Sequence, residues 1–232
     1  MVRPSGGDRA SLTAITRILV VSDIGGNETV WRKFVNAISL DVYKVDAALL
    51  AGGLGVDAKR AQAWIELAAE RLADVSIPLC LIPGAADDPA VDIELTAVER
   101  NPVNVDGRAY PLPGGLTLIS DSCRPGSPPI AERLAALAAD AGGPLVLMTA
   151  APPYDPATAS GSREVAKAID RLRPGLSLHG CSGVGDETPD PKRFIGDTLA
   201  LTPGSEADRD GLLGFVVDLV GAGVRLARPF QT

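Results

Sequence analysis

Several carboxylate side chains follow apolar runs of the sequence, in positions suited to chemistry. Asp23 follows the run ILVVS, Asp87 follows LCLIPGAA, and Asp121 follows LTLIS. In α/β enzymes, the carboxyl ends of parallel strands carry the residues that bind ligands. Carboxylates are also common ligands of divalent cations. Asp23 is therefore our candidate ligand for a single metal ion, and Asp121, Asp186 and Glu187 would extend it to an acidic cluster if they share its cleft.

The only histidine, His179, lies at the expected end of a strand, before a glycine. It is either a ligand or general base, or a packed, hydrogen-bonded histidine. Cys181 and Ser182 follow it. A thiolate at Cys181 is a possible zinc donor, but one donor does not make a site, and a small buried cysteine is the alternative. The chain has no GxSxG motif, so we predict no nucleophilic triad.

Glycines and aspartates at other turns have structural explanations. Gly52, Gly53 and Gly55 in AGGLG suggest a phosphate cradle, but they lack the lysine and the spacing of a P-loop, which favours turn glycines. Asp23 is suited to accept hydrogen bonds from the N–H groups of its own turn. Asp87 and Asp88 are suited to cap a helix that begins at a proline.

The elements that would position these residues alternate between strands and helices. Short apolar runs predict strands, and apolar residues at helical spacing predict amphipathic helices, with Asn27 as the cap of the first. Strands are expected at residues 17–22, 47–51, 78–82, 116–120, 144–148 and 176–179, helices at 28–40, 58–72, 130–141 and 163–173, and hairpins in RFIGDTLAL and LLGFVVDLVGAGVRLA. Parallel crossovers followed by antiparallel hairpins indicate a mixed sheet or two packed sheets.

Composition and charge restrict the class of protein. The chain has 232 residues, of which 46% are hydrophobic and 22% charged, as in a globular protein. Its net charge of −7 argues against nucleic acid or an anionic membrane surface as the main partner. Three widely spaced cysteines indicate a reducing compartment. We expect a cytoplasmic protein with a flexible tail at residues 1–16 and a single domain at 17–232.

Five segments at strand ends resemble the signature loops of the calcineurin-like metallophosphoesterases. In that family the loops read D-x-H-G-N, G-D, G-N-H-D, a lone H before a Pro-Pro-Tyr-like turn, and G-H-x-H. The corresponding segments here, in the same order, are VVSDIGGN, ALLAGGLG, LIPGAADD, VLMTAAPPYD with Tyr154 in its turn, and SLHGCSGVG. The resemblance implies a four-layer α-β-β-α sandwich of two mixed sheets. It also implies a cleft in which two metal ions clamp a phosphate ester.

The sequence departs from the family at most of the metal-binding positions. Asp23 matches the first aspartate, Asn27 the asparagine of the first loop, and Asp87 the aspartate that orients a histidine. The ligand positions occupied by other residues are Gly25, Gly53, Ala85, Ala86, Ala150, Cys181 and Gly183. Since the loss of one outer partner of a metal costs about 10 to 100-fold in affinity, the loss of most direct ligands predicts that no binuclear site remains.

The glycines and alanines at the ligand positions predict one of two outcomes for the cleft. Either the backbone has closed in on the missing side chains, or an empty cleft survives that accepts a small ligand. Our leading hypothesis is a degenerate phosphoesterase that binds a protein partner or a small phosphate-containing ligand, with no cofactor. One alternative is a phosphohydrolase with a single Mn, Fe, Zn or Mg ion held by Asp23 and neighbours such as Asp121 or Asp87. Another is a structural subunit of a homo-oligomer.

Overall fold

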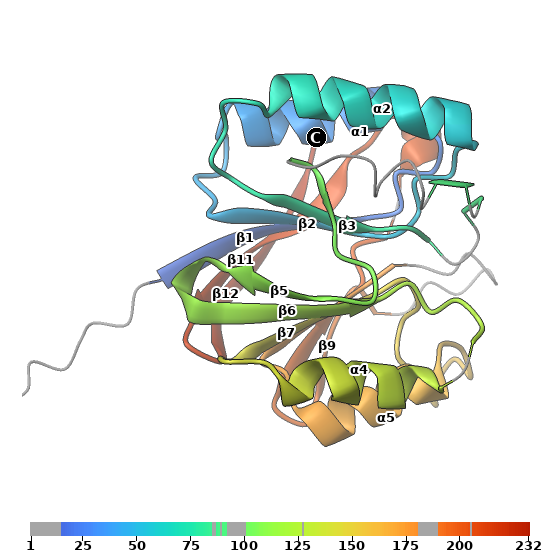
Figure 1. Ribbon diagram of the computed structural model, residues 1–232, viewed down its shortest axis with the longest axis vertical. Helices are drawn as coiled ribbons and strands as arrows, with labels where there is room; N and C mark the ends of the chain where they lie inside the picture. Colours follow the sequence, from blue (N-terminus) through green and yellow to red (C-terminus); the bar gives the residue numbers. More distant parts are fainter. Residues whose placement is uncertain are drawn as a thin grey trace, which may run out of the picture.

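The computed structural model describes residues 15–84, 87–88, 90–91, 101–126, 128–180, 190–204 and 206–232. It has four layers, with two sheets packed face to face and helices on both outer surfaces (Figure 1). The predicted α-β-β-α sandwich of two mixed sheets is therefore confirmed. No described helix is long and apolar enough to cross a membrane.

The first sheet has the strand order β12-β11-β1-β2-β3-β4. Neighbouring strands β1, β2, β3 and β4 are parallel, whereas β11 is antiparallel to both β1 and β12. Its strands are β1 (Ile15–Ser22), β2 (Ala47–Ala51), β3 (Leu79–Ile82), β4 (Val103–Asn104), β11 (Leu213–Val220) and β12 (Gly223–Gln231). Helices α1 (Glu28–Ser39) and α2 (Ala58–Arg71) cover its outer face.

The second sheet has the order β5-β6-β7-β8-β10-β9. Its strands are β5 (Ala109–Leu112), β6 (Leu116–Asp121), β7 (Leu145–Thr149), β8 (Leu176–His179), β9 (Lys192–Ile195) and β10 (Thr198–Leu201). Helices α4 (Ile130–Ala139) and α5 (Arg163–Leu172) cover its outer face. Short 3-10 turns, η1 (Pro113–Gly115) and η2 (Ala207–Arg209), complete the described elements.

Alternation along the strands divides the apolar residues among three clusters. On β1, Leu19 and Val21 face α1 and α2, while Ile18 and Val20 face the second sheet. The same division places Ile119 and Leu147 against α4 and α5. Because one cluster lies between the sheets, the packing of each sheet constrains the position of the other.

Local signals explain the helix in the first crossover. Asn27 accepts hydrogen bonds from Thr29 N–H and Val30 N–H, as predicted for an N-cap. The indole N–H of Trp31 donates to Trp64 O over 3.0 Å, and the two indole rings stack at 5.8 Å. These contacts hold α1 and α2 side by side over the sheet.

The predicted strands and helices are found with small changes at their ends. β1 begins at Ile15, because Ile15 pairs with Val220 and Thr16 with Leu219. The prediction that the tail extends to residue 16 is therefore wrong for these two residues, and residues 1–14 lie outside the described part. β4 and β5 were not predicted, since β4 has two residues and β5 contains Pro111.

Candidate functional site

The loops after β1 and β2 are joined by their backbones at the carboxyl edge of the first sheet. Asp23 N–H donates to Gly52 O over 3.3 Å, and Gly25 N–H donates to Gly53 O over 3.0 Å. Gly26 N–H donates to Leu54 O over 2.7 Å. These bonds continue the pairing of β1 with β2 beyond the strands. The two loops that would carry opposing metal ligands in a phosphoesterase instead bind one another.

Gly53 packs so closely against Asp23 that no side chain fits there. A Cβ added at Gly53 would lie 2.6 Å from Asp23 Cα and still closer to its Oδ1. Gly53 also has a φ of +69°, a conformation that side chains disfavour. The bridging aspartate of the calcineurin-like phosphoesterases would therefore have no room at position 53. The carboxylate of Asp23 lies against the place where the Cβ of such an aspartate would be.

Glycines close the other loops in the same way. A Cβ at Gly84 would lie 2.6 Å from Gly53 N, and one at Gly52 would lie 3.3 Å from Ala150 Cβ. A Cβ at Gly180 would lie 2.5 Å from Ala51 O and 2.7 Å from Ala150 O. Backbone from both sheets therefore meets at this edge. Of the two predicted outcomes, closure of the backbone is the one found among the described loops.

Asp87 accepts hydrogen bonds from three backbone N–H groups. Its carboxylate binds Gly84 N–H at 2.7 Å, Gly55 N–H at 2.9 Å and Leu54 N–H at 3.2 Å, and its side chain is buried. The prediction that Asp87 caps a helix is therefore wrong, because the carboxylate joins the loops after β2 and β3. Asp88 alone makes a cap-type contact, by accepting Ala90 N–H at 2.9 Å.

Asn27 is engaged by α1 and by a loop near the C-terminus. Besides capping α1, its side-chain amide donates to Asp210 Oδ1 over 2.6 Å. Lys33 donates to Asp210 O over 3.0 Å. The side chain of Asn27 therefore serves as a structural link between two segments of the chain.

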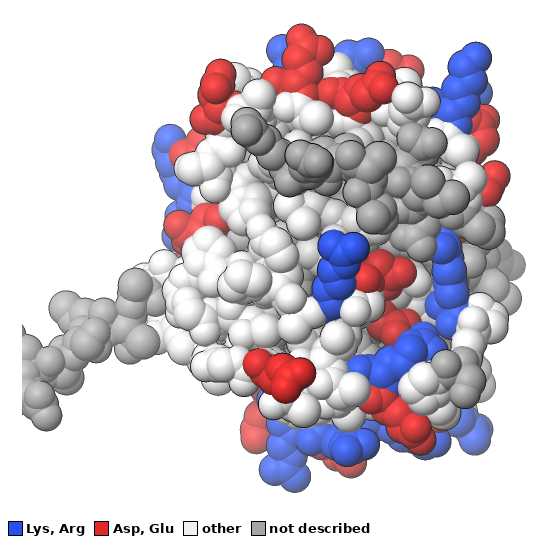
Figure 2. All heavy atoms as spheres, in the orientation of Figure 1, with Lys and Arg blue, Asp and Glu red and all other residues white. Residues whose placement is uncertain are grey.

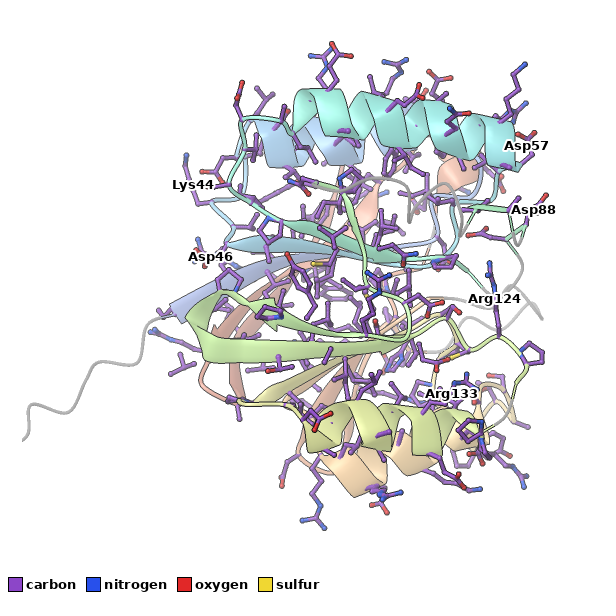
Figure 3. All side chains as sticks on the ribbon, viewed as in Figure 1. Lys44, Asp46, Asp57, Asp88, Arg124 and Arg133 are labelled. Carbon is purple, nitrogen blue, oxygen red and sulfur yellow. The ribbon has the colours of Figure 1, made fainter. Side chains whose placement is uncertain are left out.

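Asp121 is bound by an arginine of α4. Its two carboxylate oxygens receive a bidentate pair from Arg133 at 2.7 Å each, and Oδ1 also accepts Cys123 N–H at 2.7 Å. The hydrogen bond to Asp121 raises the pKa of Arg133, and burial raises the pKa of the Cys123 thiol to about 12. Arg133 extends from α4 toward the loop that carries Arg124 (Figure 3). Both oxygens of Asp121 are thus committed to an ion pair.

His179 is enclosed beneath α5 and the turn after β7. It is fully buried, with Nδ1 2.7 Å from Thr149 Oγ1 and Nε2 2.9 Å from Ser177 Oγ. Because the Thr149 hydroxyl donates its proton to Ala151 O, it accepts from Nδ1–H of His179, and Nε2 accepts from Ser177. Burial lowers the pKa of His179 to about 3. The histidine is a neutral, hydrogen-bonded core residue, in agreement with the packed interpretation.

The Pro-Pro-Tyr turn is held by two arginines that the sequence prediction did not identify. Arg193 donates to Pro153 O over 2.7 Å and pairs with Asp155 at 2.8 Å. Arg163 lies 4.9 Å from the ring centre of Tyr154. Ala150, which the resemblance aligns with the lone histidine of the family, is buried between the sheets. The only prior signal for Arg193 was its place in a hairpin edge strand.

Part of the predicted site lies outside the described residues. Ala85 and Ala86 of the third loop belong to it, as do Cys181, Ser182 and Gly183 of the fifth. Asp186 and Glu187 also lie outside the described residues. Among the residues that are described, no group of three or more His, Cys, Asp or Glu side chains is placed to hold a metal ion.

Solved structures share this arrangement. TT1561 of Thermus thermophilus superposes with a TM-score of 0.72 and 21% identity, over 94% of this chain and 99% of that one. GAP50, described as the anchor in the inner membrane complex of Plasmodium, superposes with a TM-score of 0.51 and 11% identity, over 92% of this chain and 88% of that one. No protein-family model and no curated protein matches the sequence. The similarities show a shared fold.

The described residues at the loop edge do not supply the ligands for a pair of metal ions. Gly53 leaves no room for a bridging side chain, Asp87 is occupied by three N–H groups, and Asp121 is paired with Arg133. Among the described residues at the family's metal-ligand positions, Asp23 is the one whose side chain is of the type that the family uses. A single carboxylate supplies too few donors for a binuclear site.

A groove lies away from the loop edge, between α1 and α2. It has a volume of about 650 Å³ and reaches the loops only at Gly26. Charged side chains from both helices line it, over a floor that includes Ala63, Trp64 and Leu67. The sequence prediction did not include this surface. The sequence signal for this groove was the regular spacing of the exposed residues along α2.

Proposed function

We propose that this chain is a degenerate metallophosphoesterase-fold protein that acts as a binding module rather than a phosphoesterase. The observation that carries the proposal is the contact between Gly53 and Asp23, where an added Cβ would lie 2.6 Å from Asp23 Cα. A metal-bridging carboxylate is excluded from that position by sterics. The order of the five resembling loops supports the phosphoesterase origin of the scaffold.

The favoured ligand is a protein partner rather than a small phosphate ester. The described loops at the former cleft are packed backbone to backbone, whereas the groove of about 650 Å³ lies on the outer helices. The acidic net charge of −7 disfavours nucleic acid. The fold is compatible with such a role, since GAP50, which shares it, is described as an anchor.

The competing hypothesis is a hydrolase with one metal ion at Asp23. The ion pair of Asp121 with Arg133 weighs against it, as do the three N–H groups bound to Asp87. Recruiting Asp121 would leave the half-buried Arg133 without its partner. Recruiting Asp87 would leave the buried N–H groups of Leu54 and Gly84 without theirs, which costs on the order of 1–3 kcal/mol for each buried group.

The test combines metal content with turnover on one sample. The full chain is purified without chelator, reloaded with Mn²⁺, and assayed by mass spectrometry and with a generic phosphodiester. We expect less than about 0.1 ion per chain and no turnover, because one carboxylate does not hold a catalytic ion. One ion per chain, with turnover that is lost in Asp23→Asn but kept in Asp57→Asn, would refute the proposal. Asp57 is the matched control because it caps α2 by accepting Arg60 N–H.

A further inference from the structure

Helix α2 presents a stripe of four residues on its outer surface. The stripe consists of Arg60, Ala63, Leu67 and Glu70, all of which line the groove between α1 and α2. Arg60, Ala63 and Glu70 are exposed, and Leu67 is half-buried. Their spacing of three, four and three residues confines them to about 80° of arc on a helix. This is the spacing by which one helix packs along another.

The two ends of the stripe carry opposite charges. Among the described residues, neither Arg60 nor Glu70 forms an ion pair. They are ten positions apart, or about 15 Å along the helix. Acidic and basic side chains both lie along the edge of the molecule that α2 forms (Figure 2). The stripe thus offers one cation and one anion that form no ion pair with another described residue, separated by a small and a large apolar residue.

This order of residues is complementary to itself when reversed. If a second α2 lies antiparallel to the first, with the centre of contact beside Ile65, Arg60 of each copy faces Glu70 of the other. Ala63 of each copy then faces Leu67 of the other, so a large side chain packs against a small one. A contact in which the same patch meets itself in this way is the isologous interface of a two-fold dimer.

We infer that the chain forms a two-fold homodimer through antiparallel pairing of α2 with α2 of a second copy. Each α2 lies along the groove beside α1 of the other copy, and two Arg60–Glu70 ion pairs fix the register. The inference concerns the groove that the proposed function offers to a protein partner, and it names a second copy of this chain as that partner. It uses none of the residues of the loop edge, so the metal and turnover assays do not test it. It names a second copy as the occupant because the stripe is complementary in charge and in side-chain size to its own sequence in reverse.

The dimer is expected to be weak. Each stripe contributes one leucine, and exposed ion pairs stabilise an interface only slightly. Glu66, which also lines the groove, would lie beside its symmetry mate near the two-fold axis and repel it. We expect a dissociation constant between about 10 µM and about 1 mM. Glu66→Gln should tighten the dimer, and an unchanged dissociation constant would overturn the placement of the axis.

The test uses sedimentation equilibrium of the full chain from about 1 µM to about 1 mM. Arg60→Glu and Glu70→Arg should each weaken the dimer about tenfold or more, because each creates two like-charge contacts. Arg171→Glu is the matched control, since it makes the same charge change on exposed α5 of the opposite layer and should leave the dimer intact. Circular dichroism checks that each variant is folded.

Mixing the two single variants gives the decisive result. An Arg60→Glu chain paired with a Glu70→Arg chain has opposite charges at both contacts. Heterodimers should therefore form at the wild-type concentration, although each variant alone dimerises about tenfold more weakly or less. The double variant Arg60→Glu/Glu70→Arg should also dimerise. A wild-type chain that stays monomeric to about 1 mM overturns the proposal. The proposal is also overturned if Arg60→Glu or Glu70→Arg leaves the dissociation constant of the dimer unchanged, or if the mixture of these two variants stays monomeric.

Discussion

Among single residues, Gly53 has the strongest steric requirement at the loop edge. Gly53→Ala should destabilise the protein by about 3 kcal/mol or more, because it adds a clash with Asp23 to the cost of a positive φ. Gly107→Ala is the control, since Gly107 has a φ of +64° and no atom within 4 Å of an added Cβ. It should cost about 1–2 kcal/mol. Urea unfolding measures the loss in the free energy of unfolding for both variants. Equal losses would mean that the loops are not packed as described.

The protonation of His179 gives a second prediction for a single residue. Its pKa of about 3 lies below the usual value of 6.5, because the folded protein buries the ring. The folded state therefore binds fewer protons than the unfolded state between these values. The stability from neutral His179 is fully present above pH 6.5 and falls by about 1.4 kcal/mol per pH unit as the pH drops toward 3.

Proton NMR tests this prediction directly because the chain has one histidine. The imidazole resonances of the folded protein should not shift between about pH 8 and pH 5, since the ring stays neutral in that range. A titration with a midpoint near the usual pKa would show that water reaches the ring. The unfolded chain in urea supplies the control, because its histidine should titrate near its usual pKa.

Among the elements, the loops after β2 and β3 depend on one carboxylate. Asp87→Asn replaces an oxygen that accepts N–H groups with an amide that donates, so at least one N–H of Gly55, Gly84 or Leu54 loses its partner. We expect a loss of about 2–4 kcal/mol and faster hydrogen exchange at these amides. Asp88→Asn, which alters one bond to Ala90, should cost less than about 1 kcal/mol. Similar losses would contradict the linking role of Asp87.

Sequence patterns predicted the elements better than their contacts. Periodicity gave the bounds of β2 and the cap at Asn27, because burial and capping act over a few residues. β5 was missed, because Pro111 and exposed side chains hide its pairing with β6. The replacement of a ligand by Gly53 was evident from the sequence, but the contact with Asp23 was not. It depends on how two loops from different strands approach, which no local pattern specifies.

Across the whole molecule, the two sheets meet at their carboxyl edge through backbone contacts of the described loops. Gly180 after β8 lies against Ala51 of β2 and Ala150 after β7, where an added Cβ would be 2.5 to 2.7 Å from their carbonyl oxygens. The thermal midpoint should therefore be independent of Mn²⁺, Zn²⁺ or chelator. A ligand at one hundred times its dissociation constant stabilises the folded state by about 2.7 kcal/mol.

That gain would raise the midpoint of a domain of this size by about 5 °C or more. We expect a shift below about 1 °C in differential scanning calorimetry at about 1 mM metal, because the described residues offer no set of three ligands. A larger shift that disappears in Asp23→Asn would show that an ion joins the sheets at this edge. A shift that persists in Asp23→Asn would place the ion at another site, and the close packing of the loops around Gly53 would then hold this edge together without an ion at Asp23.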